Sequence, residues 1–419
     1  MSKPVRPIIV VTGANGGVGF GICQRLLFQL CEVNPTDALP QSFALDSDTS
    51  DLGLSSGYDG LTLIMACRST KRAEAARTEL LGLLDAHVAK LRKRKDYDGH
   101  ADEFRKNVVI DIVSLDLAMI SSVFKFADEV STKYPYISRL ICNAGVASFS
   151  RISWPGCIKQ MLTAPMISVT APNYYGQHSG ERSIDGLGWV WQCNLFGHYV
   201  LFRSIQHLLL AAPPSLGARV IWTSSIEASP VYLDPDDWQL RRTDHSYESV
   251  KYQIDLVSTT LDRRALQSPA SRRIRHFVTQ PGVCSTNVSA ALVGPVMDFF
   301  KVVMFYVARF LGSPHHPIMP YKAAIGAVHL TLASLTFITL YTKSSSTNME
   351  DRMRAPRPAK FGAETDWYGT ERVGVDEVKD WEEFKGEGEM LLGKCEALFQ
   401  TFKDAEEVTV NWDTASEHM

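Results

Sequence analysis

Tyr247 and Lys251 lie four residues apart in the string SYESVKY. On a helix, this spacing puts both side chains on one face, so that the ammonium can lie beside the phenol and lower its pKa. The pair is typical of a carbonyl reductase, although the pattern alone also arises by chance in long helices. The Tyr-Lys pattern is more informative here because three other strings precede it in the expected order: PIIVVTGANGGVGFGI, RLICNAG and RVIWTSS. Together they predict a nucleotide site followed by a catalytic helix.

The first of these strings places Gly13, Gly17 and Gly19 between an expected strand at 7–14 and an expected helix at 17–30. Glycine permits the tight turn and lets the backbone approach a pyrophosphate at the helix amino end, where free N–H groups favour anions. We therefore expect a dinucleotide at this turn.

The expected second strand, LTLIMACRS, ends in Arg68. An Asp or Glu at that position would bind the ribose 2′-hydroxyl of NAD. Arg68, with Ser69 and with Lys71 or Arg72 nearby, instead suits a 2′-phosphate, which favours NADP(H). A solvated basic helix start would leave the choice of cofactor open.

Two further strand ends complete the nucleotide half. Asp116 and Leu117 close the third strand, where an adenine would lie. Asn143, Ala144 and Gly145 end the fourth strand, close to the same ribose.

Strands alternate with helices along the chain, which predicts an α/β fold with a doubly wound parallel sheet covered on both faces. Further strands are expected at 61–67, 108–117, 140–142, 219–224 and 274–279, and helices at 70–91, between the third and fourth strands, and at 189–210 and 247–266. We assign residues 1–343 to one NADP-binding domain with loop insertions at about 31–60, 90–106, 151–185 and 226–245. The polar stretch 344–419 is expected to be a C-terminal extension, either a peripheral helix or partly disordered.

Composition excludes several classes of protein. The net charge of −3 over 419 residues shows no basic excess, so no nucleic-acid partner is expected. The eight cysteines are scattered without a C-x-x-C pair, which indicates reduced core thiols. His315 and His316 lack further ligands, so we expect a surface turn and no metal. The amino terminus, MSKPVRP, has no apolar core, so no cleaved signal peptide is expected.

These motifs resemble those of the short-chain dehydrogenases/reductases, which have a Rossmann-type fold. TGANGGVG is similar to their T-G-x-x-x-G-x-G loop, CNAG to their N-N-A-G, and QPGVCSTN to their proline-glycine nicotinamide loop. More narrowly, ACRS, ICNAG, VIWTSS and SYESVKYQ, with the long insertions, resemble fungal 3-keto-steroid reductases of sterol (ergosterol) biosynthesis and the related 17β-hydroxysteroid dehydrogenase type 7. The resemblance covers roughly residues 7–340.

The resemblance implies a role for each catalytic residue. Tyr247 would protonate the alkoxide as hydride arrives from NADPH, with its pKa lowered by Lys251 and by the nicotinamide charge. Lys251 would also hold the ribose hydroxyls. Ser225 would polarise the substrate carbonyl, and Asn194 would link Lys251 to a water relay.

The resemblance also implies the remaining cofactor contacts, with Val283 and Thr286 at the nicotinamide amide. The other residues implied in cofactor binding, beyond those already named, are Thr12, Asn15, Val18, Pro281, Gly282 and Ser285. Asn287 and Ser289 form a glycosylation sequon in form only, because they fall in this cofactor loop.

One departure from the family pattern concerns the serine. Ser225 precedes Tyr247 by 22 residues, a longer gap than in simple family members, so Ser224 or Ser229 could take its role. We prefer Ser225 for its place at a strand end. The intervening segment is expected to loop out over the site, consistent with a large apolar substrate.

Two apolar runs bear on membranes. Asp298, Lys301 and Arg309 disfavour a span at 295–311, which predicts either an amphipathic helix in one leaflet or a substrate-covering helix. The uncharged run 324–341 is at the short limit for a span, and we expect it to be buried as the last core helix.

The resemblance implies an NADPH-dependent reductase of a 3-oxo sterol, forming the 3β-alcohol during C4 demethylation. Its expected location is the cytosolic face of the endoplasmic reticulum membrane, or a lipid droplet, with other sterol-biosynthesis enzymes as partners. The alternatives are a 17-keto-steroid, retinoid or fatty-ketone reductase, and a non-catalytic scaffold of sterol enzymes. The intact Asn-Ser-Tyr-Lys set argues against the scaffold.

Overall fold

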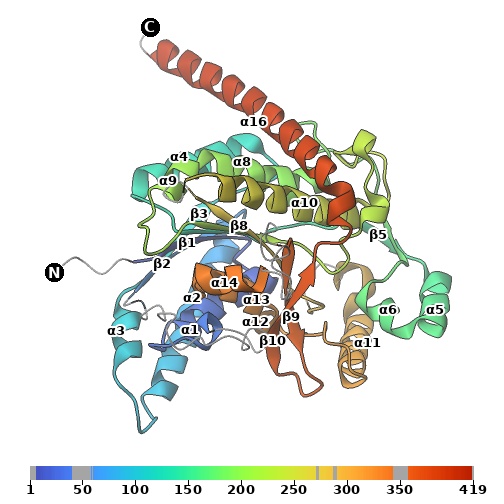
Figure 1. The fold of residues 1–419 in the computed structure, drawn as a ribbon, viewed down its shortest axis with the longest axis horizontal. Helices are drawn as coiled ribbons and strands as arrows, with labels where there is room; N and C mark the ends of the chain where they lie inside the picture. The colour runs from blue at the N-terminus through green and yellow to red at the C-terminus, as the bar shows by residue number, and fades with distance from the viewer. Residues whose placement is uncertain are drawn as a thin grey trace, which may run out of the picture.

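A computed structural model describes residues 6–39, 58, 60–269, 273–285, 290–342 and 357–417. Figure 1 shows a central sheet with helices on both of its faces. Within the described residues, the sheet has eight strands in the order β10-β9-β8-β7-β4-β1-β2-β3. Its strands are β1 Ile8–Thr12, β2 Leu61–Cys67, β3 Val108–Ser114, β4 Arg139–Cys142, β7 Arg219–Thr223, β8 Arg275–Gln280, β9 Ala359–Thr365 and β10 Glu371–Glu377.

The strand order makes the sheet doubly wound. From β1 the chain proceeds to β2 and β3 on one side, and then returns to place β4 on the other side of β1. Neighbours from β3 to β9 pair in parallel, and β10 pairs with β9 antiparallel. The carboxyl ends of β1 and β4 therefore flank the point where ligands bind in such sheets. The predicted fold class is confirmed.

The strands carry apolar side chains on both faces, because helices cover both faces of a parallel sheet. In β1, Ile8 and Val10 enter one core, and Ile9 and Val11 enter the other. The helices are α1 Gly17–Gln29, α2 Thr70–Leu91, α3 His100–Lys106, α4 Ile120–Lys133, α5 Trp154–Thr163, α6 Pro165–Thr170, α7 Trp189–Trp191, α8 Gly197–Ser204, α9 Gln206–Leu210, α10 Ser246–Gln267, α11 Ala290–Phe310, α12 Pro320–Ala323, α13 Ile325–Leu332, α14 Leu335–Thr342 and α16 Trp381–Glu417.

Residues 324–333 of the uncharged run are buried, as predicted, whereas Thr336 is exposed, and the run forms two helices where one was expected. Arg139 and Arg219, both almost fully buried, explain the break. Arg139 donates to the carbonyl of Thr331 (3.0 Å), and Arg219 donates to those of Leu330 (2.6 Å) and Ala333 (2.7 Å). Cations at the last carbonyls complement the helix dipole, so α13 ends there.

The polar C-terminal stretch contributes to the core of the fold. The expectation of a peripheral helix misses β9 and β10, which extend the central sheet. Phe361 of β9 is fully buried, and α16 packs its Leu391, Cys395 and Phe399 into the core beside α10. These strands were missed because only a few of their side chains are apolar, and neighbouring β8 supplies their pairing.

Two expected loop insertions contain secondary structure. Residues 100–106 of the charged stretch form α3, with Ala101 and Phe104 buried. The insertion at 151–185 includes α5 and α6 and most of a small antiparallel sheet, β5 Phe149–Ile152 and β6 Tyr175–Gln177.

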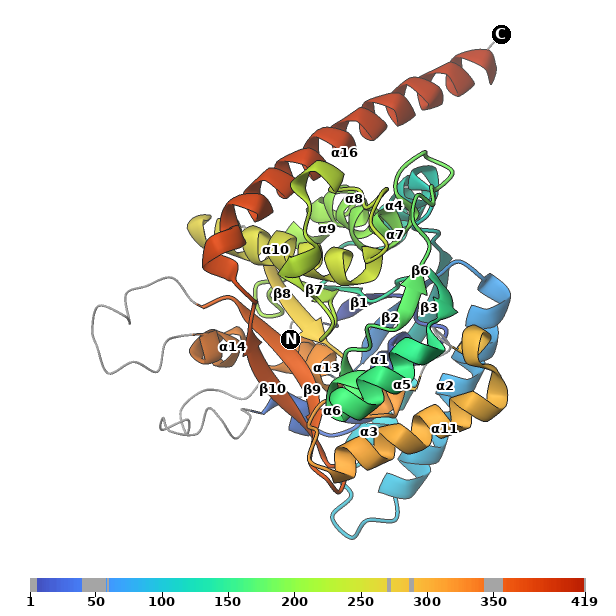
Figure 2. The same ribbon diagram turned by 90° about the vertical axis from the view of Figure 1, so that its right-hand side faces the viewer.

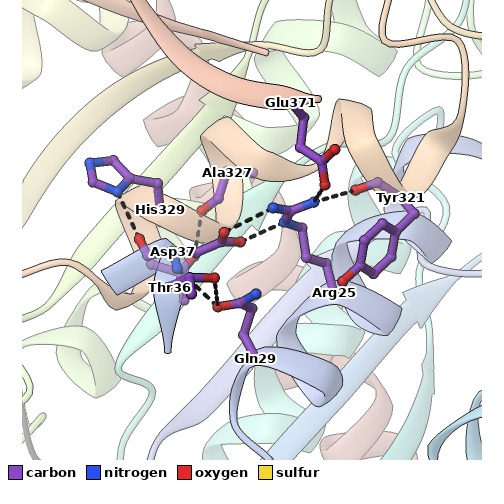
Figure 3. Close-up of polar contacts among 9 residues, drawn as sticks. Arg25, Gln29, Thr36, Asp37, Tyr321, Ala327, His329 and Glu371 are labelled. Atoms are coloured by element: carbon purple, nitrogen blue, oxygen red, sulfur yellow. Dashed lines mark hydrogen bonds and ion pairs between the residues drawn. The ribbon is translucent and has the colours of Figure 1, made fainter. Parts of the chain in front are cut away.

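A buried ion pair anchors the start of the insertion at 31–60. Arg25 of α1 makes two bonds to Asp37 (2.5 and 2.8 Å) and one to Glu371 of β10 (2.8 Å), as Figure 3 shows. His329 of α13 contacts the carbonyl of Asp37 at 2.7 Å. The helix after the glycine turn is thereby tied to the C-terminal hairpin.

Candidate active site

The glycine turn has the geometry that a pyrophosphate site requires. Gly13 has a φ of 67° and Gly17 a φ of 52°, conformations that favour glycine. A Cβ on Gly19 would lie 2.3 Å from the carbonyl oxygen of Gly13, so no other residue fits there. No acidic side chain lies in the first turn of α1, and no side chain caps its amino end. Its free N–H groups therefore suit an anion.

A hydrogen-bond network joins the ends of β1 and β4. The Thr12 hydroxyl accepts bonds from the backbone amides of Asn143 (2.9 Å) and Ala144 (2.9 Å), and the Asn143 side chain donates to the Thr12 carbonyl (3.0 Å). His198 of α8 contacts the Thr12 hydroxyl (2.9 Å) and the carbonyl of Asn194 (3.0 Å). Sequence reasoning missed His198, whose signal is its place one helical turn after Asn194.

The predicted phosphate-binding side chains lie at the carboxyl end of β2. Arg68, Lys71 and Arg72 are exposed, and Ser69 caps α2 by accepting a bond from the Arg72 amide at 3.4 Å. The strand that these residues follow lies beside the glycine turn, because the Gly13 amide donates to the carbonyl of Ala66 on β2 (2.8 Å). Their role toward a 2′-phosphate stays a prediction.

Asp116 and Leu117 were expected to close the third strand, but β3 ends at Ser114 and both residues lie just beyond it. Asp116 accepts a bond from the Ala118 amide (3.0 Å), and the carbonyl of Leu117 accepts one from the Gln192 side chain (3.2 Å). The Leu117 side chain is buried in the core, so an adenine could meet only its backbone and the adjoining turn.

Tyr247 and Lys251 lie on one face of α10, as predicted. The Lys251 ammonium donates to the carbonyl of Thr223 (2.9 Å) and lies 5.5 Å from the centroid of the Tyr247 ring. Burial lowers the pKa of Lys251 to about 8. Burial, and then the carboxylate of Glu227, raise the pKa of Tyr247, while a hydrogen bond with Ser225 opposes them. The predicted lowering of the Tyr247 pKa is wrong for this structure, because desolvation of the phenol outweighs the opposing contacts.

Asn194 lies in a π-helical segment, Gln192–Phe196, which interrupts the helix predicted at 189–210. Its amide donates to the carbonyls of Val146 and Val190, both at 2.8 Å, and its buried side-chain oxygen has no partner in the described structure. A Cβ on Gly145 would lie 2.5 Å from that oxygen and 3.7 Å from the Lys251 ammonium. Asn194 and Lys251 thus converge on Gly145.

The geometry favours Ser225 over its neighbours. Ser225 accepts a bond from the Glu227 amide (3.1 Å), and its hydroxyl is hydrogen-bonded to Tyr247. The Ser224 hydroxyl is fully buried and donates to the carbonyl of Lys251 (3.1 Å). Ser229 follows Ala228 on the loop and bonds to the α10 backbone through its amide.

The proline-glycine loop after β8 is held by the turn at 313–319. Gly282 has a φ of 65°, and a Cβ there would lie 2.8 Å from the ring of Pro317. Val283 donates to the carbonyl of His315 (2.7 Å), and Ser285 to that of Ile318 (2.8 Å). Pro281 begins this loop, whereas Thr286 and the sequon lie outside the described residues.

His316 is fully buried, which corrects the expectation of a surface turn. Its ring contacts the Ser313 hydroxyl (2.8 Å) and the carbonyl of Val169 (3.3 Å). These contacts tie the turn to α6, so His316 serves packing.

Aromatic rings from the small sheet cover Tyr247. Phe149 lies 6.1 Å from the Tyr247 ring and 5.0 Å from that of Tyr175, between ring centroids. The segment 226–245, expected to cover the site, packs elsewhere over most of its length: Trp238 meets Trp191 edge-on at 5.0 Å, and the Pro235 carbonyl accepts a bond from α16. The cover therefore comes from the insertion at 151–185 and the strand that leads into it.

Comparison with known proteins bears on this site. A 3-keto-steroid reductase from Eremothecium gossypii is 32% identical over 314 residues, which cover 73% of this chain and 84% of the relative. This chain belongs to the 3-keto-steroid reductase family. Family members from Schizosaccharomyces pombe (27% over 368 residues, 88% of this chain and 89% of the relative) and Saccharomyces cerevisiae (28% over 351 residues, 83% and 87%) match across most of their length. The predicted resemblance to fungal 3-keto-steroid reductases is confirmed.

No family model matches the chain. Among solved structures, an uncharacterized protein from Mycobacterium paratuberculosis aligns with a TM-score of 0.49 and 19% identity over 94% of each chain. The strand order and the glycine turn of this chain establish its fold without that alignment.

Proposed function

We propose that this protein reduces a 3-oxo sterol to the 3β-hydroxy sterol with NADPH, after a substituent has been lost from C4. The observation that carries the proposal is the convergence of Ser225 and Lys251 on the Tyr247 phenol at the carboxyl end of the sheet. The names of the relatives support the substrate class.

The residues present fit NADPH. The glycine turn would take the pyrophosphate, and Arg68, with Ser69 and Lys71, would take the 2′-phosphate. The orphaned side-chain oxygen of Asn194 and the Lys251 ammonium face Gly145, where a ribose hydroxyl could bond. The dinucleotide would supply the hydride.

The side chains then have separate tasks. Burial keeps the Tyr247 phenol protonated at neutral pH, the state that a proton donor to a carbonyl oxygen needs. Ser225 would donate a hydrogen bond to the same oxygen and orient it. Lys251, charged below its pKa of about 8, would stabilise the phenolate that forms when the proton leaves.

An apolar substrate suits the surroundings of Tyr247. The rings of Phe149, Tyr174 and Tyr175 lie along one side, and α11 packs against β5 and α6 behind them. Such a wall offers flat apolar area to a fused-ring ketone and few polar groups that would be left unsatisfied.

We further propose that this side of the molecule rests on the surface of the endoplasmic reticulum membrane. Figure 2 shows α5, α6 and α11 along one side, with the turn between β9 and β10 near α11. Within the described residues, no helix has the length and apolar content to cross a bilayer. The apolar face, as we call it, consists of Trp154, Ile158, Met161, Leu162, Ile167, Met297, Phe299, Phe300, Val303, Tyr306, Val307, Phe310, Leu311, Trp367 and Tyr368.

The composition of the apolar face favours a lipid interface. On α11 its members recur at helical spacing, and Phe310 lies 6.5 Å from the Trp367 ring. Trp and Tyr at the margin of an apolar helix face suit the headgroup level of a bilayer. A sterol ketone dissolved in the bilayer could then reach Tyr247 without crossing water.

The test is product identification with the purified protein. NADPH would be supplied with a 3-keto-sterol, a 17-keto-steroid and retinal in mixed detergent micelles, with NADH in parallel. We expect consumption of NADPH with the 3-keto-sterol and formation of its 3β-alcohol. Reduction of the 17-keto-steroid or of retinal alone would overturn the proposed substrate, and no reduction of any ketone would overturn the enzymatic function.

A further inference from the structure

A buried ion pair joins the catalytic helix to the C-terminal segment. Asp255 lies four residues after Lys251, on the same face of α10, and its carboxylate is 2.6 Å from the ammonium of Lys360 on β9. The two side chains are 2% and 7% exposed.

This pair is a costly way to hold β9 in place. Withdrawing two charges from water is expensive, and apolar side chains of similar volume often stabilise a core as well or better. The residue beside Lys360 on β8 is Val278, which is buried and apolar. Packing therefore does not require an ion pair here. Because the Asp255–Lys360 pair lies next to Lys251, we looked to the active site for its role.

We propose that Asp255 and Lys360 form a positioning pair that sets the charge around Lys251, so that the C-terminal strand takes part in the chemistry. This inference rests on the proposed function in one respect, the catalytic role of Lys251. The charge relationship itself is independent of turnover.

The charged neighbours of Lys251 act in opposite directions. Burial lowers the pKa of Lys251, Asp255 raises it, Lys360 lowers it and Glu227, on the loop after β7, raises it. Burial raises the pKa of Glu227 itself to about 8, so Glu227 gains its charge in the same pH range in which Lys251 loses its own. His198 also faces Lys251 from α8, and burial lowers its pKa to about 4, so it is neutral at physiological pH. An unbalanced Asp255 would hold the Lys251 proton more tightly, whereas an unbalanced Lys360 would expel it.

The carboxylate of Asp255 in turn depends on Lys360. Burial raises the pKa of Asp255, and the ion pair with Lys360 opposes this, aided by Ser224 and by Lys379 of the C-terminal segment. Tyr252, on the next turn of α10, donates to the carbonyl of Lys379 at 2.6 Å. Besides α16, the C-terminal segment therefore contacts this part of α10 through β9 and through the residues that follow β10.

The experiment compares Lys360→Met, Asp255→Asn and the double variant. The pKa of Lys251 would be read from the carbon-13 shift of its Cε in lysine-labelled protein, with the signal assigned by its loss in Lys251→Met. We expect the pKa to rise by about one unit in Lys360→Met, to fall by about one unit in Asp255→Asn, and to return near the parent value in the double variant. The alkaline limb of kcat should move in the same directions, because reduction needs the charged ammonium.

A second ion pair on the same helix supplies the control. Asp262 of α10 meets Arg275 of β8 at 2.7 Å, and their side chains are 17% and 7% exposed. Asp262→Asn and Arg275→Met should lower the thermal midpoint, as Asp255→Asn and Lys360→Met do. Unlike those two variants, they should leave the pKa of Lys251 unchanged. The double variant Asp255→Asn/Lys360→Met leaves no unpaired charge, so it keeps the comparison available if a single variant folds poorly.

The outcomes separate the two proposals. If the pKa of Lys251 is the same in both single variants as in the parent protein, the ion pair only anchors β9. The inference is then overturned, whether or not a ketone is reduced. If the Lys251 signal moves in opposite directions while no ketone is reduced, the charge relationship stands and the proposed function fails.

Discussion

The side-chain carbonyl of Gln177 accepts a hydrogen bond from the backbone amide of Tyr247 at 2.9 Å. It also accepts one from the Ser246 hydroxyl (3.0 Å), and the Gln177 amide donates to Glu248 (2.6 Å). The residue at the N-cap position of α10, His245, supplies no side-chain cap. Gln177, from β6, therefore accepts a hydrogen bond from a free backbone amide at the amino end of the catalytic helix. It holds the first turn of that helix against the small sheet that carries Phe149 and Tyr175.

Replacing Gln177 with Leu should lower kcat by about ten- to a hundredfold, because a displaced first turn moves the Tyr247 phenol away from the substrate oxygen. The far-ultraviolet circular dichroism should stay that of the parent. Gln160→Leu is the matched control: Gln160 is a buried glutamine of the same insertion, and among the described residues its side chain bonds to Ala171 and Asn173. Equal losses in both variants would mean that the insertion merely needs to fold.

Tyr247→Phe should reduce kcat by at least about a hundredfold and spare NADPH affinity, since only the proton donor is lost. Single-turnover kinetics and fluorescence titration with NADPH would measure the two effects. Tyr252→Phe, on the next turn of α10, should keep most of its activity, because in the described structure that hydroxyl donates to the Lys379 carbonyl, away from the active site. Turnover of Tyr247→Phe within tenfold of the parent would rule out the assignment.

Arg68→Asp should move cofactor preference from NADPH toward NADH by about tenfold or more. The substitution removes a phosphate partner and offers a carboxylate to a ribose diol. The kcat/KM ratio for the two cofactors is the measurement, and Arg77→Asp, about two turns into α2, is the control. An unchanged ratio would assign the phosphate to Lys71 or Arg72.

Phe300→Glu with Val307→Glu should release the protein from membranes, because two carboxylates on the apolar face oppose insertion. Flotation with liposomes would measure binding, and the KM for sterol in liposomes should rise while activity on a small water-soluble ketone is kept. Leu210→Glu with Val231→Glu changes two exposed apolar residues outside the apolar face and should leave binding intact. If the first variant still floats and resists carbonate extraction, the apolar face is not the attachment.

Asp37→Asn should lower the free energy of unfolding by about 3–5 kcal/mol, because it leaves the buried Arg25 guanidinium with only one carboxylate. Urea unfolding followed by circular dichroism would measure the loss. Lys106→Met, which removes an exposed i,i+3 pair with Glu103, should leave the urea midpoint at the parent value, because water already solvates both charges.

The same cluster should contribute to acid sensitivity. Burial raises the pKa of Glu371, but the bond from Arg25 prevails and holds it below its ordinary value. A carboxyl with a depressed pKa stabilises the fold above its unfolded pKa and loses that contribution as pH falls through the folded pKa. Glu371→Gln should therefore flatten the decline in stability on the acid side, and an identical pH profile would contradict this sign.

The nucleotide turn, most of the parallel sheet and the Tyr247–Lys251 pair could be predicted from the amino-acid sequence alone. These features depend on contiguous residues: apolar runs that suit a strand buried on both faces, glycines that a tight turn requires, and the spacing of one helical turn. Their physical causes act over a few residues, so they can be predicted before the chain is folded.

Only the tertiary structure placed Gln177 on the Tyr247 amide, 70 residues away, and Lys360 beside Asp255, 105 residues away. Both residues stand in polar surroundings without a periodic apolar pattern, so no local signal marks them. Their partners are set by which edge of the sheet β9 extends and by where the β5–β6 insertion meets α10. A buried polar group binds whatever donor or charge the assembled core brings near it, and folding decides that neighbour.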